Sequence, residues 1–100
     1  MDKYQVMLLS KARRDLDSIY AHIANTFLEP GTAEGMIDAL ETGILSLEEM
    51  PYRCSERKHG IYANKGYRQL FIKSYTVIYR IDEELKKVIV TTVRYSRSYF

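Results

Sequence analysis

Three stretches decide the fold: YRQLFIK (67–73), YTVIYRID (75–82) and KVIVTTVRYSR (87–97). Each is rich in β-branched and aromatic residues, which favour strands over helices. The first two are separated by a tight turn at 73–74 and the last two by a longer polar turn at 82–86. Short connections of this kind join antiparallel neighbours, so the sequence predicts three hairpin-linked antiparallel strands.

Alternation along the middle strand divides its side chains between two faces of the sheet. One face would carry Tyr75, Val77, Tyr79 and Ile81, and the other Thr76, Ile78, Arg80 and Asp82. Neither set is wholly apolar, so the sequence leaves open which face meets the helices. The interleaved cations make this sheet suitable for an RNA strand, because cations neutralise phosphates and aromatic rings stack on bases. It would equally suit an acidic protein partner.

Two amphipathic helices are expected before the sheet, following a short apolar segment at 4–9. Ser10 is the expected N-cap of the first helix, and Pro30-Gly31 separates the helices. Thr32 is the expected cap of the second helix, which should end at Pro51. Apolar residues recur at helical spacing in both helices: Ala12, Leu16, Ile19, Tyr20, Ile23 and Phe27, then Ala33, Met36, Ile37, Leu40, Ile44 and Leu47.

This helical hairpin must bury its apolar stripes against the sheet, which predicts an α+β fold with Tyr20 in the core. A polar and basic loop, 51–66, would join the second helix to the sheet, with a short strand near Ile61-Tyr62. The chain is long enough for one domain, 1–100, with a core that needs no metal or disulfide. Cys54 is the single cysteine, so an internal disulfide and a cysteine-rich metal site are excluded.

The net charge of +2 conceals a strong asymmetry. Residues 1–50 carry four Lys/Arg and nine Asp/Glu, whereas residues 51–100 carry eleven and four. This pattern favours an anionic partner for one face, although a solvated acidic helix surface would produce the same pattern. No stretch has the length and hydropathy of a signal peptide or a membrane span, so we expect a cytoplasmic protein without membrane contact.

Several stretches, in this order, resemble the RelE/ParE superfamily of bacterial toxins: Tyr4-Gln5-Val6, Leu9-Ser10-Lys11-Ala12, Asp15-Leu16, Tyr67-Arg68-Gln69-Leu70, 75–81 and 90–97. The resemblance implies an N-terminal strand, an antiparallel two-helix hairpin, and a three- to four-stranded antiparallel sheet that the N-terminal strand joins. It also implies the toxin of a type II toxin–antitoxin, plasmid-stabilisation-like module, held inactive by a cognate antitoxin protein.

Two mechanisms occur on this fold, and fold alone does not choose between them. RelE-like members enter the ribosome and cut mRNA without a metal or cofactor, which halts translation. ParE-like members inhibit DNA gyrase and need no catalytic residues. Our first expectation is ribosome-dependent mRNA cleavage, with gyrase inhibition as the alternative and a non-toxic or decayed binding module as a third possibility.

For mRNA cleavage, the resemblance implies a set of cations that bind phosphate and a tyrosine that assists proton transfer. The candidate catalytic residues are Arg68, Arg80, Arg94, Arg97 and either Tyr95 or Tyr99, and the candidate RNA contacts are Arg57, Lys58, Lys65 and Lys73. Arginine suits this role because its planar fork donates two parallel hydrogen bonds to a phosphate.

The chain departs from the nuclease pattern at Thr76, where those members place an arginine, and the final strand has no histidine. A threonine hydroxyl cannot supply the missing charge, so Arg80 or Lys73 would have to replace it. A tyrosine with its ordinary pKa near 10 would need tuning to act as a base. His22, on the first helix, is expected to have no functional role.

Overall fold

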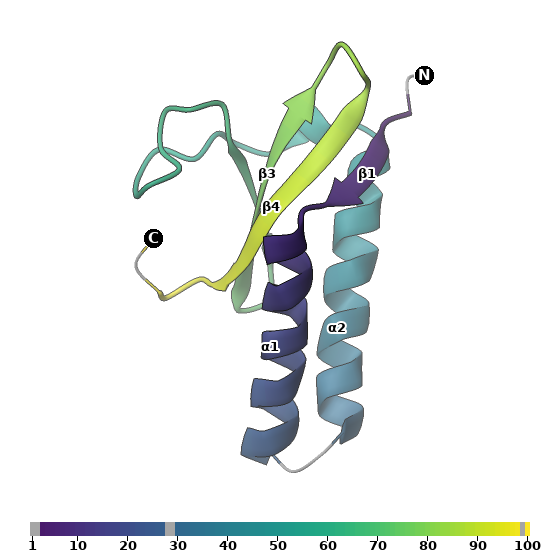
Figure 1. The fold of residues 1–100 in the computed structure, drawn as a ribbon, viewed down its shortest axis with the longest axis vertical. Coiled ribbons are helices and arrows are strands. Elements are labelled where there is room, and N and C mark those ends of the chain that lie inside the picture. The colour runs from purple at the N-terminus through teal and green to yellow at the C-terminus, as the bar shows by residue number, and fades with distance from the viewer. Residues whose placement is uncertain (1–2, 28–29, 99) are drawn as a thin grey trace.

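The computed structural model describes residues 3–27, 30–98 and 100 and has the predicted α+β architecture (Figure 1). Two helices lie against one face of a four-stranded sheet, whose strand order is β1-β4-β3-β2. The elements in chain order are β1 (Gln5–Leu8), α1 (Ser10–Phe27), α2 (Pro30–Leu45), two 3₁₀ turns (Ser46–Glu48 and Pro51–Arg53), β2 (Arg68–Ile72), β3 (Tyr75–Asp82) and β4 (Lys87–Tyr95).

The sheet is mixed, because β1 joins it parallel to β4 while β2, β3 and β4 are antiparallel. The prediction that the N-terminal strand joins the sheet is confirmed, but its parallel direction was not foreseen. Hairpin turns dictate the direction of β2, β3 and β4. No hairpin joins β1 to β4, since the helices and two strands intervene, and such a strand is free to pair in either direction.

Helix α2 and the loop after it differ from the sequence-based boundaries. The helix begins at Pro30, so Thr32 lies inside it, and α-helical geometry ends at Leu45 rather than at Pro51. Proline is well suited to a first helical turn, because the N–H that it lacks would have had no partner there. The predicted strand near Ile61-Tyr62 is wrong: residues 61–66 form turns.

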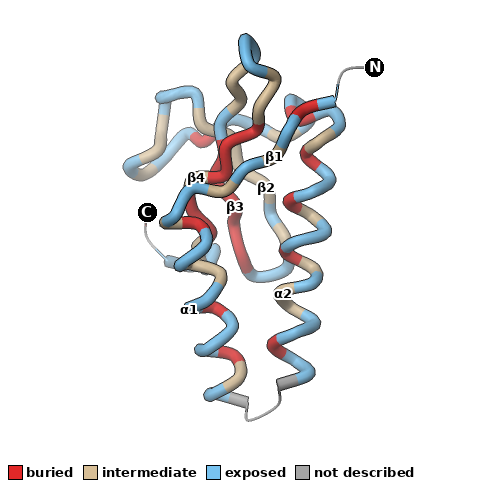
Figure 2. The backbone as a smooth tube through the Cα atoms, turned by 45° about the vertical axis from the view of Figure 1, so that its right-hand side comes forward, coloured by how far each residue is buried: buried red, intermediate tan, exposed pale blue. Residues whose placement is uncertain are grey.

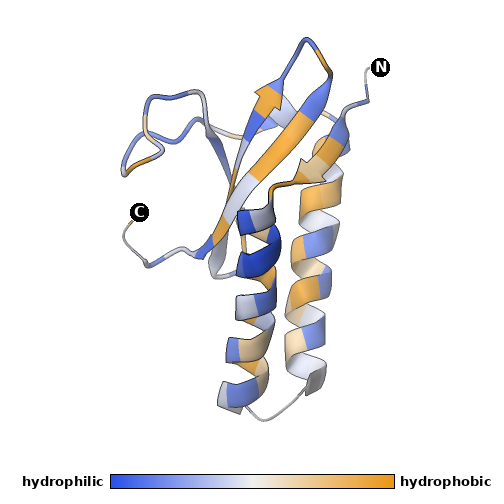
Figure 3. Ribbon diagram, in the orientation of Figure 1, coloured by the Kyte–Doolittle hydropathy of each residue, from blue (hydrophilic) through white to orange (hydrophobic). Residues whose placement is uncertain are grey.

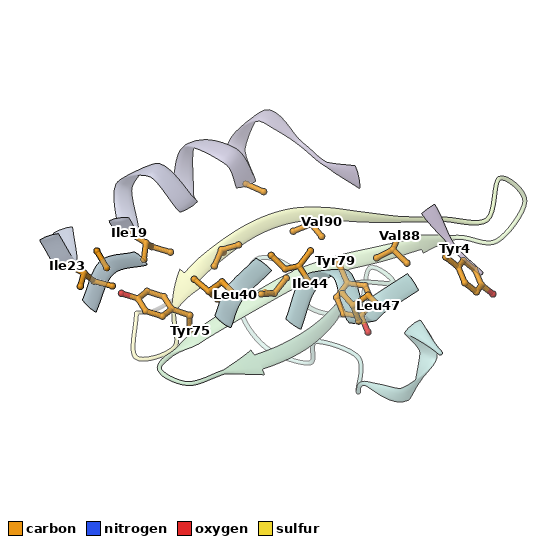
Figure 4. Packing of buried hydrophobic residues seen from close by; sticks show 14 residues of the cluster. Tyr4, Ile19, Ile23, Leu40, Ile44, Leu47, Tyr75, Tyr79, Val88 and Val90 are labelled. Carbon is orange, nitrogen blue, oxygen red and sulfur yellow. The ribbon is translucent and has the colours of Figure 1, made fainter. Parts of the chain in front are cut away.

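The core lies between the helices and the sheet, and it shows which strand face meets the helices (Figures 2 and 4). From β3 it receives Tyr75, Val77 and Tyr79, each at most 7% exposed. Leu40 and Ile44 of α2 and Ile19 and Ile23 of α1 pack against them, together with Val88 and Val90 of β4. Alternation therefore holds along β3, and the other side chains of this strand lie on the opposite face.

Tyr79 brings a hydroxyl into this core, and a hydrogen bond satisfies it. Its Oη donates to the carbonyl oxygen of Pro51 over 2.6 Å. Burial, followed by interaction with Cys54, raises the pKa of Tyr79, so this residue stays neutral.

Among the described residues, neither helix is long and apolar enough to cross a membrane.

Candidate functional site

The basic loop before β2 lies along the outer edge of that strand. The N–H of Gln69 donates to the carbonyl of Ser55 over 3.1 Å, and the N–H of Arg57 donates to the carbonyl of Tyr67 over 2.8 Å. A single bridge between Glu56 and Arg68 completes the pairing. The loop and the C-terminal segment lie on the same side of the molecule (Figure 1), and Figure 3 shows that both are largely hydrophilic.

Arg57 is buried although it belongs to this polar loop, with only 4% of its surface exposed. Its Nε donates to the carbonyl of His59 over 3.1 Å, and a terminal guanidinium nitrogen donates to Oε1 of Gln69 over 2.9 Å. Both acceptors are neutral. Burial lowers the pKa of Arg57, but an arginine remains charged at physiological pH, so a positive charge is held inside the loop.

Phe100 packs against this arginine and against a second one from β4. The guanidinium carbon of Arg57 lies 4.3 Å from the centroid of the Phe100 ring, and that of Arg94 lies 5.1 Å from it. Phe100 is only 4% exposed, and its carbonyl accepts a hydrogen bond from the N–H of Ile61 over 3.1 Å. These are cation–π contacts, in which the ring face attracts each guanidinium.

Gly60 allows the backbone of Phe100 to approach the loop this closely. Its φ of +78° favours glycine, and a Cβ added there would lie 1.9 Å from the carbonyl oxygen of Phe100. No larger residue fits without moving one of the two segments. The loop and the C-terminal segment are therefore shaped to meet at this position.

Thr76 lies beside this contact and holds the C-terminal segment. It is paired with Arg94 across β3 and β4 and is 1% exposed. Its hydroxyl shares a hydrogen bond of 2.7 Å with the hydroxyl of Ser96, whose N–H donates to the carbonyl of Ser74 over 2.8 Å. We call this group of residues the tail site: Arg57, Thr76, Arg94, Ser96 and Phe100.

Arg68 is placed elsewhere, because it is paired with Tyr79 and shares that residue's side of the sheet. Its guanidinium donates to the carbonyl of Cys54 over 2.5 Å and to that of Tyr52 over 3.4 Å. It also lies over the Tyr52 ring at 5.0 Å and pairs with Glu56 at 3.8 Å. Arg68 thus fastens the loop to the sheet, on the opposite side from Arg94.

The remaining predicted residues that the structure describes are exposed and are not gathered around one point. Tyr95 is 44% exposed and its ring meets that of Tyr75 edge to face, with the centroids 5.8 Å apart. Tyr99 lies outside the described residues. The exposed cations are Lys58, Lys65, Lys73, Arg80 and Arg97. Of the ten predicted site residues, the structure brings together Arg57 and Arg94, through a ring that the sequence did not indicate.

Sequence reasoning missed Phe100, Gly60 and Ser96 of this region. A small groove of about 250 Å³ lies between α1 and the end of β4 and is lined by His22, Tyr75, Arg94 and Tyr95, among others. The one signal for the tail contact was a glycine inside a basic loop, which by itself indicates only a turn.

Among the described residues, no group of three or more His, Cys, Asp or Glu could hold a metal ion.

A second cluster of aromatic and charged residues lies at the opposite end of the sheet, around the turn between β3 and β4. Tyr4 and Tyr52 each donate a hydrogen bond of 2.8 Å to the same oxygen of Glu83, and Lys86 pairs with its other oxygen. Hydrogen bonds from Lys86, Tyr52 and Tyr4 lower the pKa of Glu83 to about 2. Tyr4, Tyr52, Glu83 and Lys86 are called the turn cluster below.

A larger groove runs between the two helices, beside β1. Its volume is about 550 Å³, and apolar residues line it: Leu8, Leu16, Tyr20, Ile37, Ile44 and Leu45, with Arg13, Asp17 and Glu41 among them. Tyr20 is 37% exposed, so the expectation that it packs in the core is wrong. The sheet lies nearer the first half of α1, and the ring of Tyr20 faces the groove instead.

Comparison with known proteins agrees with this fold. A sequence model described as the ParE toxin of the type II toxin–antitoxin system parDE matches residues 6–99. No curated protein sequence matches. The solved structure of a chromosomal ParDE toxin–antitoxin system from P. aeruginosa is 18% identical, with a TM-score of 0.77, covering 93% of this chain and 96% of that chain.

Two RelBE toxin–antitoxin complexes are similar as well. The RelBE2 complex of Mycobacterium tuberculosis is 23% identical with a TM-score of 0.67, covering 93% of this chain and 98% of that chain. The intact E. coli RelBE complex is 14% identical with a TM-score of 0.61, covering 95% of this chain and 99% of that chain. These identities show the shared fold, whereas the family match covers nearly the whole chain. The chain therefore belongs to the ParE toxin family of type II toxin–antitoxin systems.

Proposed function

We propose that this toxin arrests growth by binding and inhibiting DNA gyrase, and that a cognate antitoxin neutralises it. The proposal rests mainly on one observation. The arginines that mRNA cleavage would require are already bonded to, or packed against, other parts of this protein. Arg57 is 4% exposed and bonded within its own loop, and Arg68 is bonded to two carbonyls on the helix side of the sheet. Arg94 lies against the Phe100 ring.

Thr76 adds to this argument. At the position where nuclease members place an arginine, this chain has a buried threonine whose hydroxyl is bonded to Ser96. A nuclease must stabilise the charge that develops on the phosphate, and it needs preorganised donors aimed at that phosphate. In this chain the corresponding groups are directed at the protein itself. Inhibition by binding needs only a surface, which is consistent with the match to the ParE toxin family.

Ribosome-dependent mRNA cleavage is the second candidate, and the exposed cations favour it. Arg80, Arg97 and the three candidate lysines, Lys58, Lys65 and Lys73, are exposed, and Tyr95 is half exposed beside the tail site. Such a surface attracts nucleic acid through counterion release, whatever the chemistry that follows. In this reading Arg94 and Arg97 would bind the scissile phosphate.

The purified chain tests the two candidates directly. It is added to gyrase with relaxed plasmid and ATP, and separately to a translating ribosome with mRNA whose cut sites are mapped by primer extension. The proposal predicts inhibited supercoiling and intact message. Cleaved message with normal supercoiling, abolished by the double change Arg94→Ala and Arg97→Ala, would establish the second candidate instead. No effect in either assay would indicate a decayed toxin.

We further propose that the antitoxin docks an apolar segment in the groove between α1 and α2. Apolar side chains remain exposed at this groove, including Leu45 at 55% and Tyr20 at 37%. A patch of this kind marks an interaction site, and the similar solved structures are toxin–antitoxin complexes.

A matched pair of leucines tests this docking site. Leu45 lines the groove, whereas Leu85, which is 62% exposed, lies in the turn between β3 and β4. Leu45→Asp should weaken antitoxin binding by about a hundredfold, since a charge in an apolar contact is poorly tolerated, and Leu85→Asp should leave it unchanged. Equal effects of the two changes in isothermal titration would exclude the groove.

A further inference from the structure

We propose that three exposed apolar side chains around the turn between β3 and β4 form the surface by which this toxin contacts DNA gyrase. They are Met50, Tyr52 and Leu85, and we call them the turn patch. The inference rests on the proposed function, because it names the part of the toxin that binds that target. The surface is separate from the groove assigned to the antitoxin, which other residues line.

The turn patch lies at one end of the molecule. The turn between β3 and β4 forms that end (Figure 1), and Tyr52, in the 3₁₀ turn Pro51–Arg53, is fixed to it because its Oη donates to Glu83 over 2.8 Å. Met50 directly precedes the 3₁₀ turn, and Leu85 follows Glu83 by two residues. The exposed fractions are 66% for Met50, 49% for Tyr52 and 62% for Leu85. Large apolar side chains exposed together are typical of a protein interaction surface.

The backbone at Met50 points to a role for its side chain outside the core. Its φ of +53° lies in the left-handed region, which is unfavourable for a residue with a Cβ and which glycine adopts readily. The guanidinium of Arg53 donates to the Met50 carbonyl over 3.4 Å and helps to hold this conformation. Because the side chain is mostly exposed, its burial does not compensate for the strain. Such strain is typical of functional sites, and methionine suits adaptable binding surfaces.

Tyr52 is held in place before any partner binds. Besides the hydrogen bond to Glu83, its ring lies 5.0 Å from the guanidinium carbon of Arg68, and its centroid lies 6.5 Å from that of the Tyr4 ring. A side chain that is already fixed loses little conformational freedom on binding. Tyrosine is also enriched among the residues that contribute most to the binding energy of protein interfaces. Tyr52 therefore has the properties of an anchor for a partner.

The charges beside the turn patch indicate a partner surface that carries cations. Glu49 precedes Met50 and Glu84 precedes Leu85; both are exposed, and in the described part of the chain neither forms an ion pair. These carboxylates repel phosphate groups, so this end is unsuited to nucleic acid. An enzyme that binds DNA carries lysine and arginine at its DNA-binding surface, and such cations complement the two carboxylates. Gyrase is such an enzyme.

Two substitutions remove patch side chains without reaching the core. Met50→Gly deletes an exposed side chain and relieves the backbone, so it should weaken gyrase inhibition while the Tm stays the same or rises. Its matched control is Asn64→Gly, at another exposed position of positive φ, +56°. Leu85→Asp places a charge in the apolar contact. Its control is Leu45→Asp, which changes a leucine of similar exposure, 55%, in the groove assigned to the antitoxin.

Each purified chain is titrated into a supercoiling assay with gyrase, relaxed plasmid and ATP. Binding to immobilised gyrase is measured by biolayer interferometry, and thermal melts check the fold. Met50→Gly and Leu85→Asp should each raise the half-inhibitory concentration about tenfold, and together about a hundredfold. Asn64→Gly and Leu45→Asp should inhibit like the parent. Glu84→Lys should also weaken inhibition, because it brings a cation against a cationic surface.

The outcomes separate this inference from the proposed function. Inhibition equal to the parent by the folded variants Met50→Gly and Leu85→Asp would overturn the turn patch and leave gyrase as the target of another surface. No inhibition by the parent chain would overturn the proposed function, and this inference with it. An equal loss in either control would also overturn the assignment to this end of the molecule. Stronger inhibition by Glu84→Lys would do the same, because it would show that this end faces DNA.

Discussion

The two aromatic–cation clusters at opposite ends of the sheet are built from similar side chains but differ in one group. The turn cluster contains a carboxylate, Glu83, which accepts hydrogen bonds from two tyrosines and pairs with Lys86. The tail site has two arginines around an aromatic ring and, among the described residues, neither arginine forms an ion pair, although Asp15 lines the groove beside Arg94. In the turn cluster, the cation forms an ion pair with a carboxylate. In the described part of the tail site, the two cations form no ion pair.

This difference separates a structural contact from a candidate ligand site. At the turn cluster, Glu83 ties Tyr4, beside β1, to the turn that joins β3 and β4, which helps to keep a short strand in the sheet. At the tail site, Arg57 contributes hydrogen bonds and a ring contact to the fold, but among the described residues it forms no ion pair. Buried charged groups that lack an ion pair are candidates for functional sites, and Arg57 at the tail site is such a group.

The largest expected effect comes from removing a cation at each cluster. Arg57→Ala should lower the free energy of unfolding by about 2 kcal/mol, because two hydrogen bonds and the ring contact are lost and Gln69 loses its donor. Lys86→Ala, at the exposed turn cluster, should cost clearly less. Urea unfolding of both variants measures this difference. Equal losses of unfolding free energy would show that the buried Arg57 contributes no more to stability than the more exposed Lys86.

The dependence of stability on pH sharpens the comparison. The pKa of Glu83 is lowered from 4.5 to about 2 in the folded chain, so its stabilisation is complete above the ordinary pKa and is lost as the pH falls through about 2. The parent Tm should exceed that of Glu83→Gln by a few degrees near neutral pH, and the gap should close between these two pKa values. The gap between the parent and Arg57→Ala should stay constant there, since arginine does not titrate.

Thermal melts by circular dichroism at a series of acidic pH values test both expectations together. A Glu83→Gln gap that persists unchanged to the lowest pH would mean that the carboxylate charge does not hold the turn cluster together.

The smallest effect concerns the hydrogen bond between Thr76 and Ser96. A double-mutant cycle with Thr76→Val and Ser96→Ala should give a coupling energy of about 0.5–1 kcal/mol, the usual net value of one such bond. Urea unfolding of the parent, both single variants and the double variant gives the coupling. A coupling near zero would mean that Thr76 does not fasten the C-terminal segment.

The sequence predicted much of the fold because its patterns are local. Hairpin turns and β-branched runs predicted β2, β3 and β4, and helical spacing predicted the stripes of α1 and α2. The sequence did not predict that β1 runs parallel to β4, because this pairing joins residues more than eighty positions apart. Tyr20 was misplaced because an apolar stripe shows which residues share a helix face, but not how far the sheet extends beneath it.

The candidate site was predicted less well, for a related reason. Arg57 was expected to contact RNA from a solvated loop, yet contacts with Gln69 and Phe100 bury it. Thr76 was interpreted only as the absence of an arginine, and the structure adds that its hydroxyl shares a hydrogen bond with Ser96, twenty residues away. In both cases the decisive neighbour is distant in sequence, and no local pattern reveals it.

The central claim is that this ParE-family toxin acts on DNA gyrase. It is tested most directly by controlled expression in bacteria with separate pulse-labelling of DNA and protein synthesis. The account predicts that DNA synthesis falls first, with induction of the DNA-damage response, while translation continues at early times. Immediate loss of translation with DNA synthesis intact would contradict it and favour mRNA cleavage.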